Sequence, residues 1–271
     1  MKNDRRSDMI GIFDSGLGGL TALKEARELY PGESIIYLGD TGRVPYGTRS
    51  KETIIRYSKQ DVRFLLTKNV DAILVACGTV STNALEELQK EFDIPIIGVV
   101  EPACRQAVSL TVNGKVAITG TSATVKSGAF ENKIKALGIE NGKNIETLSI
   151  ACPLFVPLVE NGFIERDNEI TKKTVEHYLA PVREFGADTL ILGCTHFPII
   201  ADIIADYLPG VRLVNTGKEA AKALGAYAGD NGGRSIKYYV SDDTSGFAST
   251  ASLFLGYDVT DSAERIDIEK Y

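Results

Sequence analysis

Two cysteines, Cys77 and Cys194, follow short apolar runs in two segments that resemble each other. The segments are VDAILVACGT (residues 70–79) and ADTLILGCTH (residues 187–196). In open parallel sheets, ligands bind outside the carboxyl ends of the strands, where loops lead into helices. A thiol at a helix start has a lowered pKa and can act as a base, a nucleophile or a metal ligand. We therefore expect both cysteines to carry chemistry.

The spacing of Cys194 and His196 first suggests a Cys–His nucleophile. Residues so close together at a strand end usually point to opposite sides, and Cys–His pairs normally come from separate segments. If the two halves of the chain are related by a pseudo-two-fold axis, Cys77 and Cys194 face each other across a cleft. Two bases on opposite faces of one carbon suit stereoinversion, because one removes a proton and the other delivers one.

The other two cysteines lack this placement. Cys104 lies inside a predicted helix and Cys152 precedes Pro153 in a predicted loop, so we expect both to be buried structural residues. The four cysteines show no CxxC spacing, which argues against a disulfide framework and against structural zinc. We expect no metal.

A glycine-rich turn, FDSGLGG at residues 13–19, follows the first predicted strand. Its backbone amides could hold a carboxylate or phosphate, with Asp14 and Ser15 reaching the ligand. A dinucleotide motif would need a glycine where Thr21 stands. A tight turn accounts for the glycines, but it does not explain why Asp14 and Ser15 stand at the strand end.

Two further loops are candidates for the same cleft. In GDTGRVPYGT (residues 39–48), Tyr46 and Gly47 could offer a hydroxyl and a backbone N–H, although a plain connecting loop fits equally well. In TGTSATVKSG (residues 119–128), Thr121 and Thr124 could bind an anion or cap a helix. His177 stands in a charged helix and is expected on the surface.

The chain alternates short apolar runs with amphipathic stretches, which predicts an α/β fold. The runs are continuous, as in parallel strands covered on both faces. Because the pattern restarts after IPIIGVVEP, we expect two lobes related by pseudo-two-fold symmetry. Residues 1–100 with 212–271 would form the first lobe, and residues 101–211 the second. KYYVSDD in the tail predicts one more strand, expected to be antiparallel and to pack on the first lobe.

Composition excludes some classes of partner. The 271 residues carry 30 Lys and Arg against 36 Asp and Glu, a net charge of −6, so nothing favours binding to nucleic acid or to an anionic membrane. The N-terminal MKNDRRSD is charged, and no apolar run approaches the roughly 18 residues of a membrane span. We therefore expect a cytoplasmic protein.

The motifs IGIFDSGLGGL, LGDTGRVPYG, VACGT, GTSATVKSG, CPLFVPLVE and LGCTHFP resemble, in order and spacing, those of the bacterial glutamate racemases. The resemblance covers nearly the whole chain. It implies two flavodoxin-like lobes with the active site between them, and a C-terminal segment that returns to the first lobe. It also implies a cofactor-independent interconversion of L- and D-glutamate that supplies peptidoglycan synthesis, and a homodimer.

The resemblance assigns roles to single residues. Cys77 would act on the D-enantiomer and Cys194 on the L-enantiomer. The implied supporting residues are Asp14, His196, Glu160 and Asp40. The implied substrate contacts are Asp14, Ser15, Tyr46, Gly47, Gly78, Thr79, Thr121, Thr124, Thr195 and His196.

One position departs from the family, which usually has asparagine directly after the first cysteine, where this chain has Gly78. The missing amide could cost on the order of 1.5–3 kcal/mol of binding unless another group replaces it. Three alternatives stay open. One is a racemase for another acidic amino acid such as aspartate. Another is a one-cysteine decarboxylase, which the presence of both cysteines disfavours. The third is a non-catalytic α/β protein that binds an anion or nucleotide through FDSGLGG.

Overall fold

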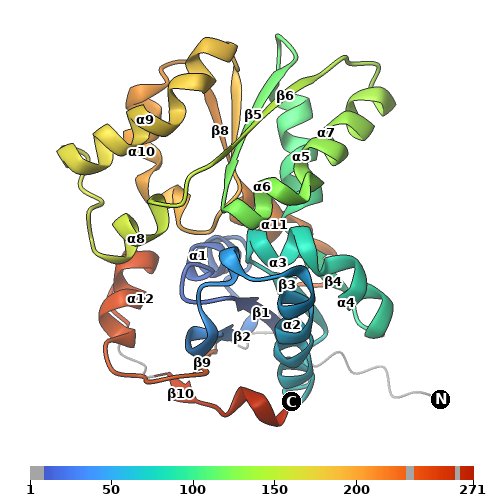
Figure 1. The fold of residues 1–271 in the computed structure, drawn as a ribbon. Coiled ribbons are helices and arrows are strands. Elements are labelled where there is room, and N and C mark those ends of the chain that lie inside the picture. The colour runs from blue at the N-terminus through green and yellow to red at the C-terminus, as the bar shows by residue number, and fades with distance from the viewer. Residues whose placement is uncertain (1–8, 230–234, 260–262) are drawn as a thin grey trace.

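The computed structural model describes residues 9–229, 235–259 and 263–271, and these form two α/β lobes (Figure 1). Every strand pairing among them is parallel. The charged N-terminal segment MKNDRRSD lies outside the described residues. The predicted fold class, two lobes with mainly parallel sheets, is confirmed.

The first sheet has six strands in the order β10-β9-β2-β1-β3-β4. Every residue of its central strands β2 and β3 is buried, because helices cover both faces of the sheet. Two central strands end at candidate residues, β1 at Asp14 and β3 two residues before Cys77. The strands are β1 (Met9–Asp14), β2 (Ser34–Gly39), β3 (Ala72–Val75), β4 (Ile96–Gly98), β9 (Ile236–Val240) and β10 (Glu264–Arg265).

The second sheet has four strands in the order β6-β5-β7-β8. They are β5 (Lys115–Gly120), β6 (Glu146–Ala151), β7 (Thr189–Leu192) and β8 (Arg212–Asn215). The strands β2-β1-β3-β4 of the first sheet follow the same order, so β3 and β7 occupy equivalent places. The echo between residues 70–79 and 187–196 thus falls on equivalent strands, while the pseudo-two-fold axis itself stays a prediction.

Helices cover both sheets, and several begin at a side chain that caps them. Ser50, Thr121, Asn168 and Asn215 each accept a hydrogen bond from the backbone N–H three residues later. The α-helices are α1 (Leu20–Leu29), α2 (Lys51–Leu66), α3 (Gly78–Asn83), α4 (Leu85–Glu91), α5 (Val100–Leu110), α6 (Ser122–Ser127), α7 (Ala129–Glu140), α8 (Phe155–Glu160), α9 (Glu169–Phe185), α10 (Ala201–Tyr207), α11 (Thr216–Ala223) and α12 (Phe247–Leu255). Short 3₁₀ turns are η1 (Thr41–Arg43), η2 (Tyr46–Thr48), η3 (Phe197–Ile200), η4 (Leu224–Ala226) and η5 (Ile268–Lys270).

One hydrophobic cluster joins the two lobes. It contains Leu23 of α1 and Phe254 of α12, which belong to the first lobe, and Phe155 of α8 and Leu190 of β7, which belong to the second. α1 also packs against α11. In Figure 1 the red helix α12 lies directly below α8, so the C-terminal part of the chain meets both lobes. The lobes therefore share apolar core on one side.

The chain crosses between the lobes twice, once between β4 and α5 and once between α11 and β9. The predicted lobe boundary before residue 212 is wrong in one respect. β8 pairs with β7, with Leu213 opposite Leu190, so residues 212–215 belong to the second sheet. An apolar strand next to β7 extends that sheet before the chain returns.

The predicted direction of the tail strand is also wrong. β9 runs parallel to β2, with Ile35 opposite Ile236. An antiparallel neighbour is typical of a short hairpin connection, whereas β9 is reached through α11 and a long crossover, which permits parallel entry. The tail does pack on the first lobe, as expected.

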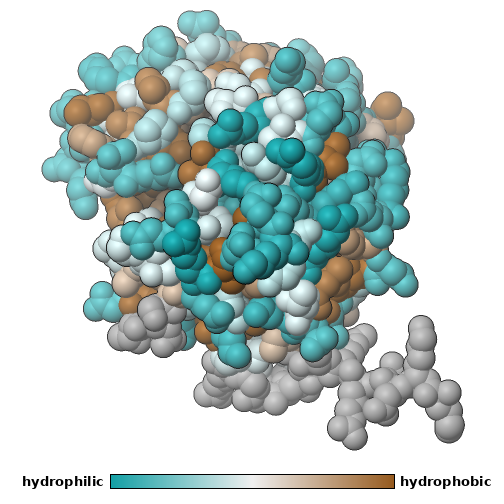
Figure 2. All heavy atoms as spheres, turned by 60° about the horizontal axis from the view of Figure 1, so that its bottom comes forward, coloured by the Kyte–Doolittle hydropathy of each residue, from teal (hydrophilic) through white to brown (hydrophobic). Residues whose placement is uncertain are grey.

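No helix in the described part of the chain is long and apolar enough to cross a membrane. Figure 2 shows one face of the molecule, where hydrophilic side chains dominate and hydrophobic ones are scattered in small groups. Small scattered apolar groups are normal for a protein surface.

Asp188 fastens the loop after α5 to the start of β7. Its carboxylate accepts hydrogen bonds from the Thr111 hydroxyl at 2.7 Å and from the backbone N–H groups of Val112 and Asn113 at 2.7 and 2.9 Å. Burial raises the pKa of Asp188, but these hydrogen bonds outweigh it and hold the pKa below its usual value. The strand that leads to Cys194 is anchored in this way.

We predict that Asp188→Ala lowers the free energy of unfolding by about 1–2 kcal/mol at neutral pH, since the carboxylate is partly exposed. Because its folded-state pKa is lowered, its contribution is complete above the unfolded-state pKa of about 3.9 and is lost as the pH falls through the folded-state pKa. Urea unfolding between pH 2.5 and 7 measures this. Glu184→Ala, at an exposed neighbour, is the control, and equal stability of the two variants at pH 7 would contradict the prediction.

Candidate active site

A cavity of about 370 Å³ lies between the carboxyl ends of the two sheets. Both lobes supply its walls, through the ends of β1, β3 and β7 and the loops that follow β2, β5 and β6. Its size and convergent polar groups suit a small molecule. The lining residues are Ser15, Gly16, Val44, Pro45, Tyr46, Gly47, Thr48, Cys77, Gly78, Thr79, Thr121, Ser122, Cys152, Pro153, Val156, Pro157, Glu160, Gly193, Cys194, Thr195 and His196.

Cys77 enters this cavity as the residue that caps α3. Its Sγ lies 3.3 Å from Oγ of Ser15. Burial raises the pKa of Cys77 to about 12, and the negative charge of Asp14 also raises it. The hydrogen bonds from Ser15 and from the backbone of Val80 lower the pKa but do not outweigh burial. The expected lowering of this pKa is therefore wrong. α3 is only six residues long, so burial outweighs its dipole, and Cys77 holds its proton at neutral pH.

Cys194 enters the cavity from the opposite lobe, two residues after β7. The helix expected to start there is not formed, because the chain turns through η3 and α10 begins only at Ala201. Sγ of Cys194 lies 3.8 Å from Nδ1 of His196. The expectation that these two side chains point apart is wrong, since the turn brings both into the cavity.

His196 is held between the thiol and a carboxylate. Its Nε2 lies 3.0 Å from Oε1 of Glu160, the last residue of α8. Burial lowers the pKa of His196, but the hydrogen bonds to Cys194 and Glu160 outweigh it and raise the pKa to about 10. The imidazole is therefore protonated at neutral pH and donates from both ring nitrogens.

Asp14 lies beneath the cavity without lining it. Its Oδ2 accepts the backbone N–H of Gly16 at 3.0 Å, which shapes the glycine-rich turn. Burial raises the pKa of Asp14, against the positive charge of His196 and backbone hydrogen bonds. Asp14 and Ser15, which were both expected to reach a ligand, therefore differ in position. Ser15 lines the cavity, whereas Asp14 supports the turn.

Threonine hydroxyls join the lobes at the cavity wall. Oγ1 of Thr79 lies 2.9 Å from Oγ1 of Thr121, and Thr121 donates to Thr124 at 3.0 Å. Thr79, Thr121 and Thr195 line the cavity, whereas Thr124 lies behind Thr121 and does not. Thr121 also caps α6. Its position is therefore compatible with both roles considered for it, binding an anion and capping a helix.

The loop after β2 closes another wall with Tyr46 and Gly47. The Tyr46 hydroxyl donates to Asp40, and Oδ2 of Asp61 lies 3.3 Å from the same oxygen. Arg43 pairs with both carboxylates, at 2.7 Å to Asp40 and 3.2 Å to Asp61. Burial raises the pKa of Tyr46, and the charges of the two carboxylates add to it. The phenol proton is therefore directed to Asp40, and Asp40 acts behind the cavity rather than in it.

Asp61 was not anticipated from the sequence. It is fully buried on α2, and burial together with the charge of Asp40 raises its pKa well above the usual range. The signal was present, because Asp61 falls on the same helical row as Ile54, Ser58 and Leu65, which are all buried. A carboxylate on an inward row indicates a buried ionic cluster.

Cys152 also differs from its expected place. It is buried, as predicted, but it lines the cavity beside Pro153, Val156 and Pro157. Burial raises its pKa, so it contributes an apolar wall. Cys104 lies outside the cavity and its Sγ donates to the Phe130 carbonyl at 3.7 Å, as a structural residue would.

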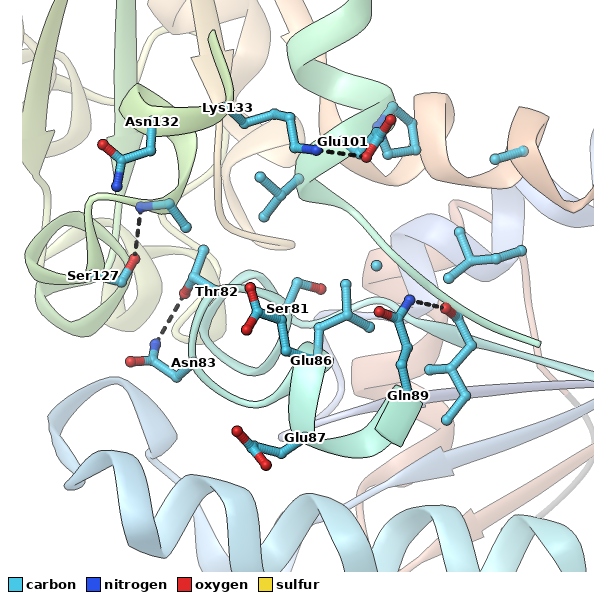
Figure 3. A pocket seen from close by; sticks show the side chains of 18 of the residues that line it. Ser81, Thr82, Asn83, Glu86, Glu87, Gln89, Glu101, Ser127, Asn132 and Lys133 are labelled. Atoms are coloured by element: carbon cyan, nitrogen blue, oxygen red, sulfur yellow. Dashed lines mark hydrogen bonds and ion pairs between the residues drawn. The ribbon is translucent and has the colours of Figure 1, made fainter. Parts of the chain in front are cut away.

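A larger cavity of about 770 Å³ lies beside α3 and α4 (Figure 3). Glu86, Glu87 and Glu101 line it, and Lys133 is paired with Glu101 at 2.7 Å. Among its described lining residues there is neither a cysteine nor a histidine. Cys77, Cys194 and His196 all lie at the smaller cavity instead. His177 is exposed, as expected.

Comparison with known proteins gives the family. A family model described as Asp/Glu/Hydantoin racemase matches residues 21–224. The chain is 47% identical over 250 residues to a glutamate racemase of Aquifex aeolicus, covering 92% of this chain and 95% of that one. It is 43% identical over 262 residues to a glutamate racemase of Persephonella marina, covering 96% and 98%. The crystal structure of the Francisella tularensis glutamate racemase in complex with D-glutamate superposes with a TM-score of 0.89 at 33% identity, covering 98% and 100%.

We predict that Glu160→Gln moves the titration of His196 to lower pH from about 10, because a hydrogen bond to the charged imidazole becomes weaker. The raised pKa also means that His196 stabilises the fold fully below the unfolded-state value of about 6.5, and that this contribution is lost as the pH rises through the folded-state pKa.

Histidine NMR titration measures this directly, since the chain has only two histidines and His177 is exposed. Glu165→Gln is the control, because it removes the same charge from an exposed position five residues away. An unchanged His196 titration in Glu160→Gln would show that the ion pair does not hold the proton.

Proposed function

Because this chain belongs to the glutamate racemase family, we propose that it interconverts L- and D-glutamate with two thiols. One of Cys77 and Cys194 removes the α-proton, and the other delivers a new proton to the opposite face of the carbon. The observation that carries the proposal is that these two thiols enter one cavity from opposite lobes. A planar carbanion between them would be accessible to one thiol from each face. Removal on one face and delivery on the other inverts the carbon.

The reaction is a balanced 1,1-proton transfer. In the L-to-D direction the thiolate of Cys194 takes the α-proton and becomes a thiol, while the C–H electron pair stays on the substrate. The S–H bond of Cys77 then breaks as its proton forms the new C–H bond, leaving Cys77 as thiolate. The reverse direction exchanges the roles, with Cys77 acting on the D-enantiomer.

The surroundings of the two sulfurs fit these starting states. The raised pKa of Cys77 keeps it protonated, which the acid of the L-to-D direction requires. The protonated His196 stands beside Cys194 and can donate Nδ1–H toward its sulfur. Glu160 holds the other ring nitrogen and fixes the orientation of the imidazole.

Hydroxyls and backbone amides would bind the substrate carboxylates. Ser15, Thr79, Thr121 and Thr195 offer hydroxyls, and no lysine or arginine is among the described lining residues. Preorganised donors can stabilise the negative charge that develops on the α-carboxylate as the proton leaves. We propose that the reaction needs no cofactor. The lining offers no lysine for the Schiff base that a pyridoxal group would use.

We further propose that the product D-glutamate supplies peptidoglycan synthesis and that the protein acts in the cytoplasm as a homodimer. Two catalytic thiols favour a reducing compartment, since disulfides form readily elsewhere. All four cysteines are free in the structure. The homodimer rests on the family resemblance, and light scattering tests it.

We predict that Cys77→Ser and Cys194→Ser each lower the rate of racemisation by about 10²–10⁴-fold or more, since each removes one of two proton-transfer groups. Residual α-proton exchange in D₂O should favour L-glutamate in Cys77→Ser and D-glutamate in Cys194→Ser. Polarimetry and NMR measure these two quantities. Cys104→Ala, outside the cavity, should retain activity, and full activity of either serine variant would exclude the two-thiol mechanism.

We predict that both glutamate enantiomers exchange their α-proton with D₂O and that aspartate does so about 10–200-fold more slowly, because one missing methylene loses contacts in a fixed cavity. Activity with aspartate but not glutamate would point to the aspartate racemases instead. Tight nucleotide binding without any α-proton exchange would indicate a binding protein.

A further inference from the structure

The backbones of the two lobes touch directly beside the two thiols. A Cβ atom built on Gly78 would lie 2.1 Å from the carbonyl oxygen of Gly193. Gly78 follows Cys77 and Gly193 precedes Cys194, so this is the point where the two thiol-bearing segments meet. Real Cβ atoms essentially never approach another heavy atom so closely.

Hydrogen bonds and close backbone contacts hold both segments in place. The N–H of Gly193 donates to the Thr119 carbonyl at 2.8 Å, and a Cβ on Gly193 would lie 2.4 Å from that oxygen. On the other side, Gly78 begins α3, and its carbonyl accepts the Thr82 hydroxyl at 2.9 Å. A side chain at position 78 is therefore accommodated only if the lobes separate.

Other glycines allow the same close approach. A Cβ on Gly18 would lie 2.4 Å from Oγ1 of Thr195, and a Cβ on Gly47 would lie 3.0 Å from Cβ of Thr121. Each contact joins the first lobe to the second across the cavity. Gly78 makes the closest of the three contacts. Its partner is a backbone oxygen, which cannot rotate away as a side chain could.

We propose that Gly78 is a positioning residue for the proton transfer, because its missing side chain lets the lobes close until Cys77 and Cys194 both reach the α-carbon. This rests on the proposed racemase function. A methyl group at position 78 would hold the backbones about 1 Å further apart than they are now. In this closed arrangement there is no room for the asparagine amide that the family usually carries there.

Gly78→Ala tests the proposal, with Gly225→Ala as the matched control. A Cβ on Gly225 would meet only the outer end of the Tyr30 side chain, with the hydroxyl nearest at 2.9 Å, and that side chain can turn. We expect kcat of Gly78→Ala to fall on the order of 100-fold in both directions, as for a misplacement of about 1 Å. The kcat of Gly47→Ala should fall by less, and the kcat of Gly225→Ala should equal that of the wild type.

The rate at which iodoacetamide alkylates each thiol, measured by mass spectrometry, reports lobe separation without relying on activity. Cys77 and Cys194 are only 5% and 7% exposed, so closed lobes protect both. We expect Gly78→Ala to raise the alkylation rate of both thiols, while Cys104, buried within the second lobe, stays unchanged. A purely local defect in α3 would affect Cys77 alone.

Faster alkylation of both thiols together with the loss of kcat supports the proposal. Unchanged alkylation of Cys194, or unchanged kcat, would overturn it. If circular dichroism shows that Gly78→Ala does not fold, Gly47→Ala takes its place, and its kcat and thiol alkylation rates are measured in the same way. A wild-type protein without glutamate racemisation would overturn the proposed function, whereas the alkylation comparison still tests the role of Gly78 in lobe closure.

Discussion

Stereoinversion by two bases requires proton-transfer groups on opposite faces of one carbon, and the two lobes of this chain can meet that requirement. One sheet can present its strand ends on one side only. Two sheets whose carboxyl edges face each other can present a group from each side. Cys77 and Cys194, the proposed proton-transfer groups, follow the equivalent strands β3 and β7, so repetition of one topology would supply both groups.

The two halves are alike in backbone order and different in charge. Cys77 stands among Asp14 and Ser15, where burial and a nearby carboxylate favour the protonated thiol. Cys194 stands beside a protonated His196 that Glu160 holds in place. A two-thiol racemase must hold one sulfur as a thiol while the other acts as a thiolate, and the raised pKa of Cys77 keeps the proton on Cys77 at neutral pH.

Much of this could be predicted from the sequence, because strand ends and glycine-rich turns have local signals. The apolar run before Cys194 and the FDSGLGG turn lead to the cavity as predicted. The features that could not be predicted from the sequence depend on contacts between distant segments. The pKa of Cys77 is set by burial, the cavity wall at Cys152 by the packing of α8, and the cluster around Asp61 by a loop that folds onto α2. The direction of β9 depends on a long crossover, which leaves no local signal.

In the order of the described strands, the chain passes between the lobes at two places, between β4 and α5 and between α11 and β9. A separation of the lobes that keeps both connections in place would be a rotation about the line through them. A shared apolar core on one side opposes sliding along that line. Such a rotation would break the contacts across the cavity together, including the hydrogen bond between Thr79 and Thr121. The same rotation would admit a substrate and draw Cys77 and Cys194 apart.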